Sequence, residues 1–92
     1  MGLLANDVLE RELASMEGWT YEQNAIQKSL VFDNYMAGIE FVNKLAVIAE
    51  SKNHHPDLTV GWCKVKVRFT SHDLGGVTRG CVDMAKAVDT LN

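Results

Sequence analysis

The sequence predicts an α+β domain, with a four-stranded antiparallel sheet and three helices packed on one of its faces. Three observations predict this fold. Two pairs of short segments alternate between apolar and polar residues, the spacing typical of half-buried strands. A long helical pattern separates the two pairs, and a shorter helical pattern lies on the outer side of each pair. Strand pairs divided by a helix form hairpins, so the order α-β-β-α-β-β-α favours this architecture.

The N-terminal third of the chain predicts one helix and one hairpin. The helix runs from about residue 6 to residue 16, and Asn6 suits its N-cap position. Two strands, at residues 19–21 and 25–32, follow around a turn at Asn24. The apolar side of the helix is formed by Val8, Leu9, Leu13 and Met16.

The longest predicted helix, from about residue 34 to residue 51, has an unusually wide apolar surface. Asp33 precedes it and suits the N-cap position. A helix that lies on one sheet needs a single apolar stripe. We therefore expect part of this surface to contact another subunit, with coverage by the terminal helices of the same chain as the alternative. The clearly polar residues occupy an arc of only about 100° at 3.6 residues per turn, and they are Glu40, Asn43, Lys44 and Ser51.

The second hairpin and a last helix complete the pattern. Strands are expected at residues 57–61 and 65–71, with Val65, Val67 and Phe69 on the buried face. The helix begins at Thr78 as its N-cap. Its buried side is formed by Cys81, Met84, Val88 and Leu91.

Length, charge and cysteine content limit the class of protein. The 92 residues predict a single domain, 1–92, and a chain this short buries only about two-thirds of its unfolded surface. Two cysteines make no disulfide framework, and the N-terminus lacks the basic and apolar regions of a signal peptide. The net charge of −3 argues against direct nucleic-acid binding, and the apolar runs are too short to span a membrane. We expect a cytoplasmic protein.

All three histidines lie where predicted elements end. His54 and His55 fall between the long helix and the third strand, where Pro56 pushes His55 toward an extended conformation. His72 closes the fourth strand and precedes a loop that contains two glycines. Imidazoles both donate and accept protons near neutral pH, so this placement favours acid–base chemistry.

Other interpretations of these residues stay open at this point. Histidines at helix ends and turns can simply be solvated. Zinc bound by three imidazoles is a second alternative, but adjacent histidines are poorly suited to converge on one ion, and no His-x-His or His-x₃-His spacing is present. Cys63 and Cys81 have no Cys–His motif around them and are best explained as packing residues.

A longer motif resembles a known family. The pattern Glu50-x₃-His54-His55-Pro56-x₅-Trp62-x₉-His72 is similar to the signature of the pterin-4a-carbinolamine dehydratases. The likeness covers nearly the whole chain. It extends to Gly18-Trp19, Phe41-Val42-Asn43 and Thr70-Ser71-His72-Asp73-x-Gly75-Gly76-Val77-Thr78.

The resemblance implies a fold, an activity and partners. Members have the α+β fold described above and usually assemble as dimers or tetramers. They are hydro-lyases that convert 4a-hydroxytetrahydropterin to quinonoid dihydropterin, which recycles the tetrahydrobiopterin of aromatic amino-acid hydroxylases, and they need no cofactor. Some animal members also bind a homeodomain transcription factor, which implies an additional nuclear pool. A non-catalytic protein-binding module of the same fold is therefore the alternative function.

Carried over by position, the resemblance also implies roles for single residues. His54 and His72 would be the catalytic acid–base pair, with the choice between acid and base left open. His55 would bind and orient the pterin. The remaining residues assigned to substrate binding are Glu50, Pro56, Trp62, Ser71 and Asp73.

One position departs from the family pattern. The family usually has Asp nine residues after the last catalytic histidine, where this chain has Cys81. With Thr78 as N-cap, that position is the third of the helix, where an acidic residue resembles a capping-box partner. We therefore expect the substitution to affect the helix start more than the chemistry. A direct role of the usual Asp in the site is the alternative, and it would make this chain a weak enzyme.

Overall fold

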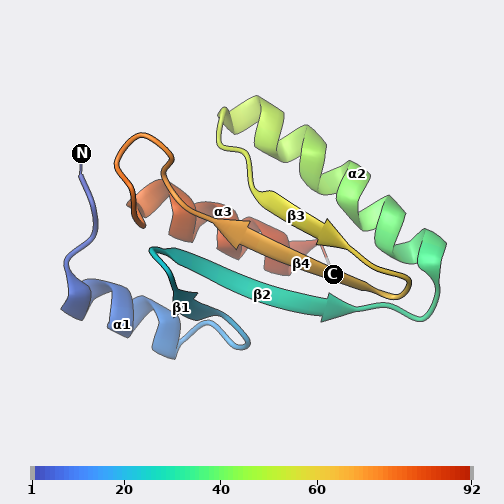
Figure 1. The fold of residues 1–92 in the computed structure, drawn as a ribbon, viewed down its shortest axis with the longest axis horizontal. Coiled ribbons are helices and arrows are strands. Elements are labelled where there is room, and N and C mark those ends of the chain that lie inside the picture. Colours follow the sequence, from blue (N-terminus) through green and yellow to red (C-terminus); the bar gives the residue numbers. More distant parts are fainter. Residues whose placement is uncertain (1, 92) are drawn as a thin grey trace.

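The computed structural model describes residues 2–91 and confirms the predicted order of elements. All strand pairs are antiparallel, in the spatial order β1-β2-β4-β3. Figure 1 shows α3 behind this sheet, α1 near β1 and α2 beside β3. The elements are α1 (Asn6–Ala14), β1 (Thr20–Glu22), β2 (Ala25–Val31), α2 (Tyr35–Lys52), β3 (Asp57–Val60), β4 (Lys64–Phe69) and α3 (Arg79–Thr90).

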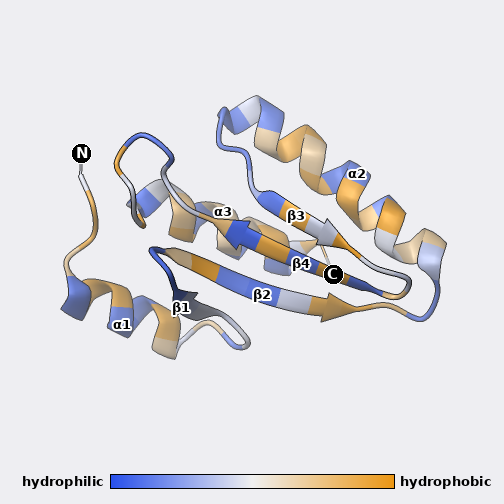
Figure 2. Cartoon of the chain, in the orientation of Figure 1, coloured by the Kyte–Doolittle hydropathy of each residue, from blue (hydrophilic) through white to orange (hydrophobic). Residues whose placement is uncertain are grey.

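The core lies between one face of the sheet and the helices. Alternate residues of β4 are fully buried, as predicted: Val65, Val67 and Phe69. Both α2 and α3 pack against β4. The lysines and the arginine that alternate with these buried residues along β4 point to the other face of the sheet. The strand therefore alternates between blue and orange in Figure 2. The period-two pattern thus places a continuous apolar layer on one side of the central strand.

Two of the predicted helix starts are wrong by one residue. Asn34, and not Asp33, caps α2, with its side-chain oxygen accepting from the Ala37 amide at 2.8 Å. The Phe32 amide donates to the Cys63 carbonyl at 2.8 Å, so the pairing continues one residue beyond the end of β2 at Val31. At α1 the N-cap is Ala5, because its carbonyl accepts the first helical bond, from Leu9. Asn6 is therefore already inside the helix.

The start of α3 and the first hairpin turn agree with their predictions, whereas α1 ends at Ala14 and not near residue 16. Thr78 is the N-cap of α3, and its hydroxyl accepts from the Cys81 amide at 3.4 Å. Gln23 and Asn24 both have positive φ, at 51° and 65°, which is the backbone of the tight turns that join twisted hairpin strands. This turn fixes the register of β1 on β2.

The wide apolar surface of α2 is only partly covered. Phe41, Leu45 and Ala49 are buried against the sheet, whereas Met36 and Val47 are exposed. The terminal helices of the same chain therefore do not cover this outer face of α2. Its coverage by a second subunit stays a prediction. No helix among residues 2–91 is long and apolar enough to cross a bilayer.

Candidate functional site

The end of α2 positions the two adjacent histidines. Asn53 adopts the left-handed conformation, with φ of 50°, and the His54 amide donates to the Ala49 carbonyl at 3.0 Å. This is the usual way in which a left-handed residue ends a helix and reverses the chain. Pro56 then leads directly into β3. The two imidazoles are thus held on a short, well-defined connection.

A closed loop after β4 positions the third histidine. Ser71 pairs with Gly76 across the loop, its amide donating to the Gly76 carbonyl at 2.7 Å. The Ser71 hydroxyl accepts from the Leu74 amide at 3.2 Å. Gly75 has φ of 70°, a conformation that other residues adopt only with strain. These bonds hold His72 and Asp73 at the tip of the loop.

These two connections meet around one polar cavity of about 270 Å³. All three histidines line it, and so do Ser71 and Asp73. The roles that the resemblance implies for these residues stay predictions. The complete lining is Asn53, His54, His55, Thr70, Ser71, His72 and Asp73.

His54 is the most enclosed of the three imidazoles. Its ring stacks on Phe69, with centroids 5.9 Å apart and planes inclined by 20°. Its Nε2 atom is buried and has no hydrogen-bond partner among residues 2–91. Burial lowers the pKa of His54 below its ordinary 6.5, and the nearby rings of His72 and His55 lower this pKa further. His54 is therefore neutral at neutral pH and able to accept a proton.

The other two imidazoles each face a carboxylate. His55 Nε2 lies 2.7 Å from Glu50 Oε1. Glu50 lies in the last turn of α2, and His55 follows the end of that helix. His72 Nε2 lies 3.7 Å from Asp57 Oδ2, and the same oxygen lies 3.5 Å from Arg68 Nη1. His54 alone has no acidic neighbour of this kind among the described residues.

Asp57 is the site residue that sequence reasoning missed. It is the first residue of β3, directly opposite Arg68 of β4 in the sheet register. Its position after Pro56 offered a signal, because a strand that begins next to the histidine pair keeps its first side chain close to them. The contact with His72 depends on the β3–β4 pairing, which sequence spacing alone does not show.

Trp62 is not part of the cavity. It lies in the turn between β3 and β4 and is 81% exposed. The histidines are at the other end of this hairpin, where Asp57 pairs with Arg68. Four residues of strand, at about 3.3 Å each, separate the two ends. Trp62 therefore does not line this cavity, and its role in substrate binding stays a prediction. Pro56 is half-buried and shapes the connection.

Cys81 lies in the core and not in the cavity. Its side chain is fully buried, and its sulfur is 3.5 Å from the Thr78 hydroxyl at the start of α3. This placement agrees with the expectation that the position matters for the helix start. Within residues 2–91, no three His, Cys, Asp or Glu side chains are grouped as metal ligands would be.

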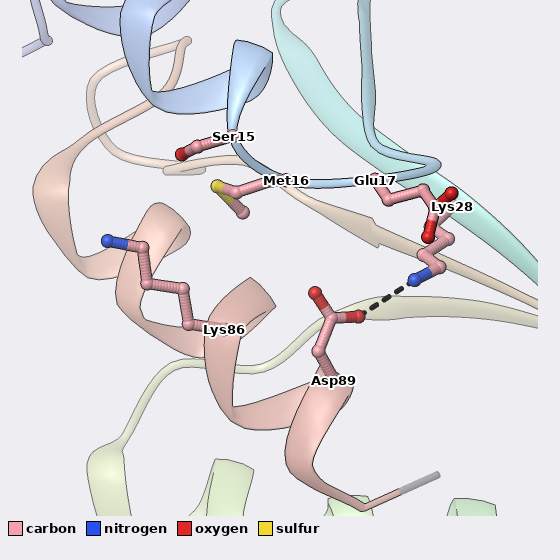
Figure 3. Close-up of a pocket in the computed structure, with 6 residues that line it drawn as sticks. All are labelled: Ser15, Met16, Glu17, Lys28, Lys86 and Asp89. Carbon is pink, nitrogen blue, oxygen red and sulfur yellow. Dashed lines mark hydrogen bonds and ion pairs between the residues drawn. The ribbon is translucent and has the colours of Figure 1, made fainter.

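A second and larger polar cavity, of about 510 Å³, lies where α1, β2 and α3 meet. Figure 3 shows its charged side chains. Lys28 Nζ is 2.9 Å from Asp89, and Lys86 Nζ is 3.0 Å from Glu12. The buried Trp19 indole also donates to Asp89, at 3.1 Å. Because these groups are already paired with one another, we interpret this cavity as part of the structural framework and not as a binding site.

Comparisons with known proteins give the site its context. The model of the family described as pterin 4 alpha carbinolamine dehydratase matches residues 3–91. A relative from Sulfurisphaera tokodaii, provisionally named a pterin-4-alpha-carbinolamine dehydratase, is 40% identical over 99% of this chain and 98% of its own. A relative from Aquifex aeolicus with the same provisional name is 41% identical over 96% of this chain and 89% of its own.

Solved structures share the fold. A crystal structure from Brucella melitensis, described as a transcriptional coactivator/pterin dehydratase, superposes with a TM-score of 0.94 at 25% identity and covers 98% of both chains. A pterin dehydratase-like RuBisCO assembly factor of the alpha-carboxysome superposes with a TM-score of 0.66 at 22% identity, over 79% of this chain and 84% of its own, which shows the fold alone. The family match and the two relatives establish that this chain belongs to the pterin-4-alpha-carbinolamine dehydratase family.

Proposed function

We propose that this protein dehydrates 4a-hydroxytetrahydropterin to quinonoid dihydropterin by histidine acid–base catalysis. The observation that carries the proposal is the meeting of His54, His55 and His72 at one polar cavity, in a chain of this family. The reaction is an elimination across the N5–C4a bond. A base takes the proton from N5, the C4a–O bond breaks, and an acid protonates the departing hydroxide to give water.

The surroundings of the imidazoles suggest which is the acid and which is the base. His54 is half-buried, has a lowered pKa and faces no carboxylate, so it is free to accept the N5 proton. His72 Nε2 lies 3.7 Å from Asp57 Oδ2, and this carboxylate can hold the ring in one orientation. We therefore assign the base to His54 and the acid to His72. Each such proton transfer contributes about 10²–10⁴ in rate.

His55 and Glu50 have a binding role in this proposal. Glu50 accepts from the Nε2–H of His55, which leaves Nδ1 of the neutral ring as an acceptor. A pterin ring carries amide and amino N–H groups that suit such an acceptor. Ser71 and Asp73 add polar groups on the opposite side of the cavity.

The cellular role follows from the proposed reaction. Removing the 4a-hydroxyl returns the pterin to a form that can be reduced again, so the enzyme would act in tetrahydrobiopterin recycling, in the cytoplasm. The exposed apolar face of α2 supports a homodimer or homotetramer.

A second candidate function is a non-catalytic binding module. The same apolar face of α2 supports it, because it offers a surface to a protein partner. The Brucella melitensis protein is described as a transcriptional coactivator as well as a pterin dehydratase. A transcription-factor partner and a nuclear pool belong to this candidate.

A spectrophotometric assay with synthetic 4a-hydroxytetrahydropterin tests the enzyme proposal. Wild-type protein should exceed the uncatalysed rate clearly, and His54→Ala and His72→Ala should each remove most of that gain. A wild-type rate equal to the uncatalysed rate would favour the binding module. Full activity in both variants would contradict the acid–base assignment while leaving the reaction itself in place.

A further inference from the structure

The segment that precedes α1 lies along the loop that carries His72. Residues 2–5 form neither helix nor strand, yet the Leu4 amide donates to the Val77 carbonyl at 2.9 Å, directly after that loop. The Leu4 side chain also packs against the core, which anchors the segment at this point. Figure 1 shows the segment beside the loop between β4 and α3. Two parts of the chain that are far apart in the sequence are thus joined next to the histidine cavity.

Leu3 lies directly on the backbone of Gly76. A Cβ atom at Gly76 would be 2.9 Å from Leu3 Cδ2 and 3.2 Å from Leu3 Cδ1, so the leucine occupies the space that a side chain would need there. Gly76 is buried, whereas Leu3 is 52% exposed. Because Gly76 has no positive φ, the close approach of Leu3, and not the backbone conformation, requires glycine at this position.

Gly76 in turn closes the loop. Its carbonyl accepts from the Ser71 amide at 2.7 Å and from the Thr70 hydroxyl at 3.4 Å. Thr70 and Ser71 line the histidine cavity, and Ser71 is the residue before His72. A path of direct contacts therefore runs from Leu3 through Gly76 to the residue that precedes His72.

The side chain of His72 is weakly held by its own contacts. It is 65% exposed, and its Nε2 atom lies 3.7 Å from the carboxylate of Asp57, which is 58% exposed. A contact between two groups of such exposure contributes little. A general acid, however, has to lie within hydrogen-bond reach of the atom that it protonates, and a displacement of about 1 Å can cost about 10²-fold in rate. The position of His72 therefore depends on the closure of its loop.

We propose that Leu3 is a positioning residue for His72. Its side chain packs on Gly76 and, together with the bond from the Leu4 amide, keeps the Ser71–Gly76 bridge closed. The loop then presents His72 to the cavity in one position. The kinetic part of the proposal rests on the proposed dehydratase function, whereas the contact and its effect on the loop do not.

Backbone ¹⁵N relaxation tests the loop without any substrate. Leu3→Ala removes the apolar atoms that cover Gly76, so the order parameter of the His72 amide should fall from the rigid value of about 0.85 to about 0.6. The order parameter of Val67 in β4 should stay in the rigid range. Val60→Ala is the matched control, because this residue is 43% exposed and lies at the far end of the β3–β4 hairpin. A His72 amide that stays as rigid in Leu3→Ala as in wild type would overturn the proposal.

Substitutions on the two sides of the contact should not add. Gly76→Ala places a methyl group where Leu3 lies, and the flexible, half-exposed leucine is the part that moves away. This variant should therefore loosen the loop as Leu3→Ala does. In the double variant the new methyl group fills part of the vacated space, so its fold-loss in kcat should not exceed that of the worse single variant. Leu3→Met keeps a long apolar side chain and should behave as wild type. A loss in the double variant equal to the product of the single losses would show that the two residues act separately.

Steady-state kinetics connects the contact to His72. Leu3→Ala should lower kcat about 10- to 100-fold, the range that a misplaced catalytic group produces, while Val60→Ala should leave kcat unchanged. In a His72→Gln background, Leu3→Ala should cause little further loss, because the residue that it positions is gone. A loss that persists in full in that background, or an unchanged kcat despite a loosened loop, would overturn the positioning role. An inactive wild type whose loop loosens in Leu3→Ala would contradict the dehydratase and leave the contact in place.

Discussion

The two polar cavities of this molecule differ in how their ionisable groups are paired. At the larger cavity, between α1, β2 and α3, Lys28 pairs with Asp89 at 2.9 Å (Figure 3), and Lys86 pairs with the neighbouring Glu12 at 3.0 Å. The smaller cavity is lined by three imidazoles, and the buried Nε2 of His54 has no hydrogen-bond partner within the described residues 2–91. Volume alone would select the larger cavity as the site. The pairing of the ionisable groups favours the smaller cavity as the site, because His54 has a nitrogen that is buried and not paired within residues 2–91.

The difference has a physical reason. Groups that already satisfy each other's charge and hydrogen bonds lose these contacts when a ligand binds, so they favour the closed structure. A buried group without a partner carries a free-energy penalty that a substrate can relieve. Perturbed, unpaired titratable groups are therefore better markers of chemistry than the size of a hollow.

The largest expected effect compares one residue from each cavity. His72→Gln should lower kcat about 10²–10⁴-fold, the usual contribution of a general acid. Lys86→Gln, at the larger cavity, should leave kcat and KM of the folded protein unchanged, because Lys86 contacts Glu12 and no residue of the histidine cavity. Steady-state kinetics of the two purified variants measures both. Equal losses in the two would remove the distinction between the cavities.

The next effect is on stability and concerns the larger cavity. Asp89→Ala removes the acceptor of the Trp19 indole, which is only 4% exposed, and the partner of Lys28. An unpaired buried N–H costs about 1–3 kcal/mol, so the free energy of unfolding in urea should fall by that amount. Asp83→Ala, on the exposed surface of the same helix, is the control. A stability equal to that of wild type would mean that the contacts of Asp89 do not stabilise the fold.

Much of the fold could be predicted from the sequence because it depends on local periodicity. Val65, Val67 and Phe69 alternate, and all three are fully buried. The caps were less certain, because Asp33 and Asn34 are adjacent and equally suited. In the structure the cap is Asn34, whose side-chain oxygen accepts from the Ala37 amide. Local preference thus gives the elements, and contacts between them set their ends.

The same distinction, between what local sequence predicts and what contacts between elements decide, applies to the site. The sequence places His54, His55 and His72 at element ends, and the family resemblance implies that they share one site. The partner of His72 could not be predicted, since Asp57 reaches it through strand pairing. The position of Trp62 at the far end of the β3–β4 hairpin could not be predicted either, because spacing along the chain does not say which end of a hairpin a residue occupies. Contacts across strands, and not motif spacing, decide these two cases.

A smaller effect links His54 to the pH dependence of stability. Because the folded state lowers the pKa of His54, the unfolded chain binds a proton near pH 6.5 that the folded chain does not. Stability should therefore fall as pH drops through 6.5 and be unaffected above it. His54→Gln should flatten the curve between pH 5 and about 7 in urea titrations. A curve as steep as that of wild type would show that other groups cause the acid sensitivity.

The smallest effect belongs to Glu12, which joins α1 to α3 near the larger cavity. Its carboxylate lies 2.9 Å from Arg79 and 3.0 Å from Lys86, and the hydrogen bond from Arg79, followed by that from Lys86, lowers its pKa below the ordinary 4.5. A lowered carboxyl pKa gives stability that is present above about pH 4.5 and lost as pH falls through the folded value. Glu12→Gln should therefore be slightly less stable than wild type at pH 7 and equal to it near pH 3. Glu10→Gln, which removes an exposed carboxylate on the same helix, controls for net charge. Because His54 loses stability from pH 6.5 downward and Glu12 only below 4.5, the two cavities should respond to acid in separate ranges. A Glu12→Gln difference that persists at pH 3 would mean that its contacts act by packing rather than by charge.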